Sequence, residues 1–172
     1  MIACLDAHYG EISCRAALVC FDHWSSSTSN SSHAEISFDP AQSYEAGSFY
    51  KRELPLLLKL IADLNPLPET ILIDAYVWLD ASCTKPGLGA RLYQAIGERS
   101  SVIGIAKSRY ISHDGESVGV PVLRGASKRP LFVTAAGITA ELAAQNVKSM
   151  HGPNRLPTMV KLADNLARGN ID

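Results

Sequence analysis

Apolar and polar residues along this chain follow two periodicities, and the shorter one predicts a set of β-strands. Residues 70–74 and 102–107 are short apolar runs rich in β-branched side chains, which is typical of strands buried on both faces. Residues 1–9 and 11–21 are separated by Gly10, which favours a hairpin turn. The predicted strands cover residues 1–9, 11–21, 34–38, 70–74, 102–107, 118–123 and 130–134.

A spacing of three or four residues between apolar positions predicts the helices. The clearest case is residues 48–64, where Phe49, Leu57 and Leu60 are among the apolar residues that share one face. Pro55 lies inside this segment and indicates a kink or a later start. The serine-rich residues 25–32 favour a loop. The predicted helices cover residues 48–64, 87–97, 140–150 and 156–167.

The order of these elements predicts the fold class. An antiparallel group of strands comes first and βαβ units follow, so we expect an α/β fold with a mixed sheet flanked by helices. The chain has 172 residues, of which 47% are hydrophobic and 19% charged, which favours a globular protein with a sizeable core. We therefore expect a single domain over residues 1–172.

Charge and hydropathy narrow the partners and the compartment. The net charge is −1, which argues against electrostatic binding of nucleic acid by the whole surface. Only Arg15 is basic in the first 50 residues, so the remaining 15 basic residues leave room for a basic groove further on. No apolar run has the length of a membrane span and the N-terminus lacks a signal-peptide pattern. We expect a cytoplasmic protein without a membrane partner.

Three groups of residues receive no chemical role from the sequence. The basic turn with Arg124, Lys128 and Arg129 is interpreted as solvated rather than as a nucleic-acid contact. The histidines show no ligand spacing. The cysteines show neither a zinc-site spacing nor a disulfide framework, and three of them lie in strand-like segments and are interpreted as core thiols. The cysteines are Cys4, Cys14, Cys20 and Cys83.

Four acidic residues and one lysine form the candidate site. Asp6 and Asp74 come at the ends of predicted strands, Lys107 ends another, and Glu53 and Asp164 lie on predicted helices. Ligands of open α/β sheets gather at the carboxyl ends of strands. Crowded carboxylates are hard oxygen ligands that suit Mg²⁺ or Mn²⁺, and such ions support phosphoryl chemistry. On the residues alone, a second interpretation remains open, in which these are ordinary ion pairs and solvated element ends.

Several stretches resemble the endonuclease V family. Residues 4–9 contain its Asp-x-x-Tyr, residues 52–55 its Arg-Glu-Leu-Pro, and residues 103–108 read Ile-Gly-Ile-Ala-Lys-Ser, close to the family's Ile-Gly-Val-Ala-Lys-Ser. Residues 155–164 resemble the closing segment that ends in Leu-Ala-Asp. Together with residues 130–133 and Gly137, these matches occur in order along nearly the whole chain.

The resemblance implies an RNase H-like fold and assigns roles to residues. Asp6, Glu53, Asp74 and Asp164 become the metal-binding carboxylates, and Lys107 becomes the catalytic lysine that acts with them. The implied cofactor is Mg²⁺ or Mn²⁺. The implied activity is that of a DNA-repair hydrolase, a metal-dependent endonuclease that cuts a phosphodiester near a deaminated base.

The same resemblance implies a nucleic-acid substrate and three residues near it. The base would be inosine, in DNA or RNA, and the products would carry 3′-hydroxyl and 5′-phosphate ends. Tyr9 and Tyr44 take the positions of aromatic residues near the substrate, and Gly47 takes the position of the glycine before the Arg-Glu-Leu-Pro signature.

Departures from the family pattern leave alternatives open. The family's Asp-Gly-Gln-Gly is here Asp74-Ala-Tyr-Val77, and Asp80 stands where the family has a histidine. Ala75 and Val77 are therefore expected to narrow or reshape the base pocket. The Pro-Tyr-Ile-Pro wedge is here Ser-Tyr-Glu-Ala at residues 43–46. A non-catalytic nucleic-acid-binding module that kept the fold, or a hydrolase of another phosphoester, would also suit these changes.

Overall fold

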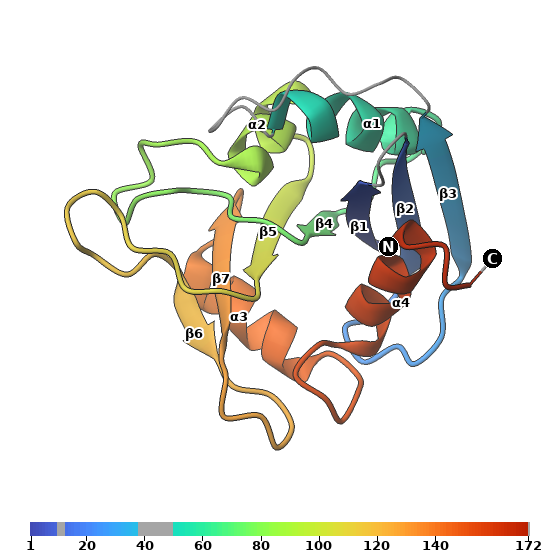
Figure 1. The fold of residues 1–172 in the computed structure, drawn as a ribbon. Coiled ribbons are helices and arrows are strands. Elements are labelled where there is room, and N and C mark those ends of the chain that lie inside the picture. Colours follow the sequence, from blue (N-terminus) through green and yellow to red (C-terminus); the bar gives the residue numbers. More distant parts are fainter. Residues whose placement is uncertain (10–12, 38–49, 172) are drawn as a thin grey trace.

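The computed structural model describes residues 1–9, 13–37 and 50–171, which form a mixed β-sheet with helices on both faces (Figure 1). The elements in chain order are β1 (Ile2–Tyr9), β2 (Cys14–Phe21), β3 (Ser31–Ser37), α1 (Tyr50–Ala62), β4 (Thr70–Ile73), α2 (Leu88–Ala95), β5 (Ser101–Ala106), β6 (Val120–Val122), β7 (Leu131–Ala136), α3 (Ala140–Ser149) and α4 (Thr158–Ala167). This confirms the predicted α/β class. No helix within these residues is long and apolar enough to cross a membrane.

The strand order brings three strand ends to one edge of the sheet. The order is β3-β2-β1-β4-β5-β7-β6. β1 runs antiparallel to β2 but parallel to β4, and β4 runs parallel to β5. The carboxyl ends of β1, β4 and β5 therefore lie side by side. Side chains that close these strands meet at that edge, as expected for a ligand site of an open sheet.

Each face of the sheet is covered by two helices (Figure 1). Successive strand residues point to opposite faces, so Leu5 of β1 packs under α1 and α2 while Cys4 packs under α3 and α4. Both faces of β1 are thus apolar in the part of the strand that precedes Asp6. Cys14 and Cys20 are likewise buried free thiols, whereas Cys83 is an exposed one.

One strand begins earlier than the pattern predicted, and one helix continues through its proline. β3 starts at Ser31 rather than near residue 34, because Ser31 and Ser32 pair with β2 despite their polar side chains. It forms an edge of the sheet, where polar side chains face solvent. α1 contains Pro55 and continues through it, with one backbone hydrogen bond fewer. The expected turn at Gly10 and the expected end of the third strand at residue 38 lie outside the described residues.

The segment after β4 crosses β5 at very close range. A Cβ on Gly104 would lie 2.3 Å from the Ala75 carbonyl oxygen and 2.9 Å from the Val77 nitrogen. Val77 itself is fully buried, and its Cγ2 fills space that a Cβ on Gly89 would occupy at 2.7 Å. The segment that follows Asp74 therefore packs directly against Gly104 of β5 and Gly89 of α2, where any larger side chain would clash.

We predict that Gly104→Ala destabilises the protein by at least about 2 kcal/mol, because the new methyl group meets backbone rather than a movable side chain. Gly115→Ala is the matched control: its φ of +80° strains an alanine, but nothing lies within 4 Å of the added Cβ. We expect it to cost only about 1 kcal/mol. Urea unfolding measures both variants, and an equal loss would contradict the close-approach argument.

Candidate active site

Two aspartates meet at the edge where β1 and β4 end. Leu5 of β1 pairs with Ile73 of β4 in parallel register, and each is followed directly by an aspartate. Asp6 and Asp74 therefore lie side by side, as the sequence predicted on the condition that these strands are neighbours. The register forces two like charges together, which costs free energy unless a cation or a proton is shared.

A third carboxylate comes from the last helix. α4 packs against β1 and β2 and presents Asp164 to the strand ends. One carboxylate oxygen from each of Asp6, Asp74 and Asp164 lies within 4.8 Å of the others. Asp164 is 5% exposed, so its charge is largely removed from bulk water.

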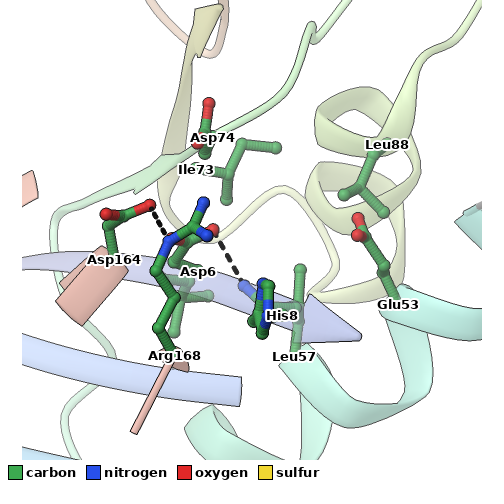
Figure 2. Close-up of a pocket in the computed structure, with 11 residues that line it drawn as sticks. Asp6, His8, Glu53, Leu57, Ile73, Asp74, Leu88, Asp164 and Arg168 are labelled. Atoms are coloured by element: carbon green, nitrogen blue, oxygen red, sulfur yellow. Dashed lines mark hydrogen bonds and ion pairs between the residues drawn. The ribbon is translucent and has the colours of Figure 1, made fainter. Parts of the chain in front are cut away.

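Glu53 reaches the same pocket from the opposite face of the sheet (Figure 2). The pocket has a volume of about 170 Å³, and Asp6, Glu53, Asp74 and Asp164 all line it. Glu53 is buried in the first turn of α1, where a carboxylate also interacts favourably with the helix dipole. Its oxygens are not part of the close group formed by the three aspartates.

Lys107 follows β5 directly and bridges two of the carboxylates. Its ammonium donates a hydrogen bond to Asp74 and lies 3.5 Å from Asp164 Oδ1. Burial would lower the pKa of Lys107, but the hydrogen bond and charge of Asp74, with the charge of Asp164, outweigh burial and raise the pKa. The lysine is therefore a fixed positive charge at the edge of the acidic pocket.

Two further cations neutralise Asp164, and the sequence gave neither of them a role. Lys161 Nζ lies 2.9 Å from Asp164 Oδ2. Arg168 Nε lies 3.0 Å from Asp164 Oδ1 (Figure 2). Burial alone would raise the pKa of Asp164, yet these hydrogen bonds lower it to about 2. Lys161 lies three residues before Asp164 and Arg168 four residues after it, and residues at these spacings share one side of a helix. The sequence could therefore have indicated both ion pairs.

Asp6 has the opposite electrostatic environment. Burial raises its pKa to about 7, and the neighbouring Asp74 carboxylate adds to the rise. Lys107 and the backbone N–H of Ala7, which donates to Asp6 Oδ1 at 2.9 Å, only partly offset this effect. In the protein without a metal, Asp6 is thus a carboxylate that holds a proton near neutral pH.

The donor set fits a hard divalent cation. Three carboxylates from separate elements offer oxygens that lie close together, and the charge conflict among them is strongest at Asp6. A bound cation would relieve this conflict and replace the proton. Oxygen ligands without a cysteine or a histidine among them suit Mg²⁺ or Mn²⁺ better than zinc.

The chain matches a known protein family over nearly its whole length. A family model described as endonuclease V matches residues 1–165. The chain belongs to the endonuclease V family. This is a family of metal-dependent nucleases, in agreement with the acidic pocket. No curated protein sequence matches the chain.

Solved endonuclease V structures have the same fold. Human endonuclease V is 18% identical and superposes with a TM-score of 0.77, covering 98% of this chain and 83% of its own. The enzyme from Bacillus subtilis is 21% identical, with a TM-score of 0.77 and coverages of 98% and 79%. A Ciona intestinalis endonuclease V in complex with DNA containing an inosine is 18% identical, with a TM-score of 0.80 and coverages of 98% and 84%. These likenesses confirm the predicted RNase H-like fold.

Two arginines hold the loop that joins α3 to α4. Arg124 is 5% exposed and donates hydrogen bonds to the carbonyls of Met150, Gly152, Asn154 and Arg155. The interpretation of Arg124 as part of a solvated turn was therefore wrong, whereas Lys128 and Arg129 are exposed. The sequence could not show this, because the carbonyls come from a loop some 30 residues away.

Arg155 continues this connection to the candidate lysine. Its Nη2 donates to the backbone carbonyl of Lys107 and, at 2.7 Å, to the carbonyl of Pro130. The side chains of Arg124 and Arg155 thus link β6, the α3–α4 loop and the end of β5. Endonuclease V resemblance had placed Arg155 in the closing segment but gave it no function.

The segment that departs from the endonuclease V glycines is well packed. Val77 is part of the core and does not line an open pocket. Tyr76 donates to the Ser108 carbonyl at 2.9 Å, accepts from the Tyr110 N–H at 3.1 Å, and its ring lies 5.8 Å from that of Tyr110. Asp80 accepts hydrogen bonds from Thr84 and the Lys85 N–H, which lower its pKa to about 2.

The other residues named from the sequence lie at the end of β1 or outside the described residues. Tyr9 ends β1 and packs against the core under α1 and α2. Tyr44 and Gly47 lie outside the described residues, as does the altered wedge at residues 43–46. Among the histidines, His8 lines the acidic pocket, a position that the absence of ligand spacing did not indicate.

We predict that the metal-free protein loses stability as the pH rises toward 7. In the unfolded chain Asp6 has its ordinary pKa of 3.8, whereas the folded protein raises the pKa to about 7. Between these values the folded state retains a proton that the unfolded state releases, so rising pH favours unfolding. Thermal unfolding in a chelator should give a lower melting temperature at pH 8 than at pH 5.5.

Two comparisons isolate this effect from the other groups around Asp6, which are Asp74, Asp164, Lys107 and Arg168. Asp6→Asn should flatten the fall, whereas Asp63→Asn on the exposed end of α1 should not. Added Mg²⁺ should raise the melting temperature more at pH 8 than at pH 5.5, since the cation then displaces no proton. A fall that Asp6→Asn leaves unchanged would contradict the assignment to Asp6.

We also predict that Arg124→Met destabilises the protein by about 2–4 kcal/mol, because buried carbonyls of the α3–α4 loop lose their donor. Lys128→Met removes the same charge from an exposed position on the same turn and should change stability by less than about 0.5 kcal/mol. Chemical denaturation measures both, and equal losses would show that the arginine contacts are not stabilising.

Proposed function

We propose that this protein is a metal-dependent endonuclease that hydrolyses a phosphodiester near a deaminated base in DNA or RNA. The products would carry 5′-phosphate and 3′-hydroxyl ends, and the base would be inosine. The observation that carries the proposal is the group of Asp6, Asp74 and Asp164 oxygens within 4.8 Å at the strand ends, with Lys107 beside it. Membership of the endonuclease V family supports it.

The proposed metal ligands are Asp6, Asp74 and Asp164, with Glu53 facing them across the pocket. A bound Mg²⁺ or Mn²⁺ would supply an activated water and stabilise the charge that develops on the phosphate. The chain's own part is to hold the carboxylates at fixed positions on rigid elements. Leu5, Leu57 and Ile73 form apolar walls of the same pocket and restrict the approach of bulk water.

Lys107 is the proposed catalytic lysine. Its ammonium is held by Asp74 and Asp164 and has no need to move far to meet a phosphate oxygen at the same edge. A fixed positive charge there would neutralise part of the negative charge of the reacting phosphodiester. Arg155 donates a hydrogen bond to the backbone carbonyl of Lys107. The lysine is therefore already oriented before substrate binds.

Nucleic acid containing a deaminated base is the proposed substrate. The Ciona intestinalis relative was solved with DNA that contains an inosine followed by a ribo-adenosine, and its fold matches this chain. Tyr9, Tyr44 and Gly47 remain the proposed substrate-binding residues. The packed segment with Tyr76 and Val77 differs from the family pattern at the positions expected to shape the base pocket.

The proposal is tested by cleavage of end-labelled single-stranded DNA and RNA with one inosine, in Mg²⁺ and in Mn²⁺. We expect metal-dependent cleavage near the inosine. Asp74→Asn should reduce the rate by at least about 100-fold, because it removes a ligand charge from the pocket. Asp63→Asn, which changes an exposed aspartate at the end of α1, should cleave like the parent.

Other outcomes would redirect the assignment. Cleavage that Asp74→Asn leaves intact would contradict the acidic pocket as the reaction centre. Cleavage without preference for inosine would retain the chemistry and discard the base specificity. Tight binding with no cleavage in either metal would favour a nucleic-acid-binding module that kept the fold.

A further inference from the structure

A second and larger hollow lies beside the acidic pocket. It has a volume of about 610 Å³, compared with about 170 Å³ for the pocket of the carboxylates. Its walls come from Lys107 at the end of β5, from residues 152–156 of the α3–α4 loop and from the outer side of α4. We call this hollow the α4 groove.

Two lysines connect the α4 groove with the candidate site. Lys107 lines the groove while its ammonium contacts Asp74 and Asp164. Lys161 also lines the groove and lies 2.9 Å from Asp164. A nucleotide strand bound at the carboxylates would therefore pass these two lysines to reach the groove.

The lining chemistry suits a nucleotide. Among the described residues the groove has three basic side chains, Lys107, Arg155 and Lys161, and no acidic one. Leu156 and Leu162 supply apolar surface, which can contact the face of a sugar or base. Phosphates prefer such cations, and bases prefer an apolar platform beside polar groups. The volume lies in the range of small-molecule sites and suits one or two nucleotides of a single strand.

The outer wall of the groove is already ordered. Arg124 fixes the carbonyls of Gly152, Asn154 and Arg155, and Arg155 in turn fixes the carbonyl of Lys107. Binding to a surface that is already ordered avoids the entropy cost of forming it. The groove is therefore a preformed site rather than a gap between loose segments.

We propose that the α4 groove binds the nucleotide strand on one side of the scissile phosphate. This inference rests on the proposed function and extends it from the reacting phosphate to a flanking subsite. Apart from Lys107, the residues of the groove contribute affinity, and hence a lower KM, without contacting the reacting atoms.

Asn154 provides the test, because its side chain is exposed on the groove wall and carries no charge. Asn154→Asp should weaken binding of a short fluorescein-labelled single-stranded DNA with one inosine by about threefold to tenfold. Asn154→Lys should tighten it by a similar factor. Fluorescence anisotropy in Ca²⁺ measures both, since Ca²⁺ fills oxygen sites. Gln145→Glu and Gln145→Lys, on exposed α3 outside the groove, are the matched controls.

Truncated DNA locates the contact. Oligonucleotides shortened on the side of the inosine that occupies the groove should bind the parent protein more weakly. With these oligonucleotides the Asn154 variants and the parent protein should have the same affinity. Oligonucleotides shortened on the other side should still distinguish them. Asn154 variants that shift affinity no more than the Gln145 controls, or that respond equally to both truncations, would overturn the proposal.

Parallel cleavage assays in Mg²⁺ separate this inference from the proposed function. Cleavage with no Asn154-specific change in binding overturns the groove and leaves the nuclease. An Asn154-specific, side-specific change in binding with no cleavage supports the groove and overturns the nuclease. Absence of binding by the parent protein overturns the groove as well.

Discussion

The site depends on the parallel pairing of β1 with β4. Because Leu5 pairs with Ile73, the residues that follow them, Asp6 and Asp74, are adjacent in the parallel register. The strand pairing therefore keeps the two carboxylates close together. A shift of one residue would turn one aspartate to the other face of the sheet. The apolar residues on both faces of these strands resist such a shift, since Leu5 and Cys4 each belong to a core. The burial of apolar side chains in the two cores thus offsets the repulsion between the Asp6 and Asp74 carboxylates.

The remaining groups at this edge are arranged around that conflict. α4 brings a third carboxylate, but it also brings Lys161 and Arg168, and β5 brings Lys107. Asp6, whose pKa is raised, and Asp164, whose pKa is lowered, therefore lie in the same pocket. Burial acts on both Asp6 and Asp164, and the difference arises because the cations lie on the Asp164 side. Such asymmetry is common at functional sites, where environments move the pKa values of like groups apart.

The sequence predicted the parts of this arrangement that depend on local pattern. Strand runs ending in Asp74 and Lys107 were enough to place both at a sheet edge. Glu53 and Asp164 were candidates on predicted helices, and the family motifs assigned them a metal-binding role. Long side chains that bind distant backbone were not predictable, because hydrogen bonds from Arg124 and Arg155 depend on where loops meet in space. The packing of Val77 against Gly89 was missed for the same reason. The valine at position 77, where the family has a glycine, suggested a narrowed base pocket. In the structure this side chain instead occupies the space left open by Gly89.

The internal cations at Asp164 also separate folding from cofactor loading. Small metal-dependent domains are often unfolded until their ion arrives, because ligand charges have no other partner. Here Lys161 and Arg168 already accompany the most buried carboxylate, and Asp6 can hold a proton. The chain can therefore reach its final shape before any ion is present and wait in that state. The supply of the proposed metal ion would then set how many of the folded molecules are active.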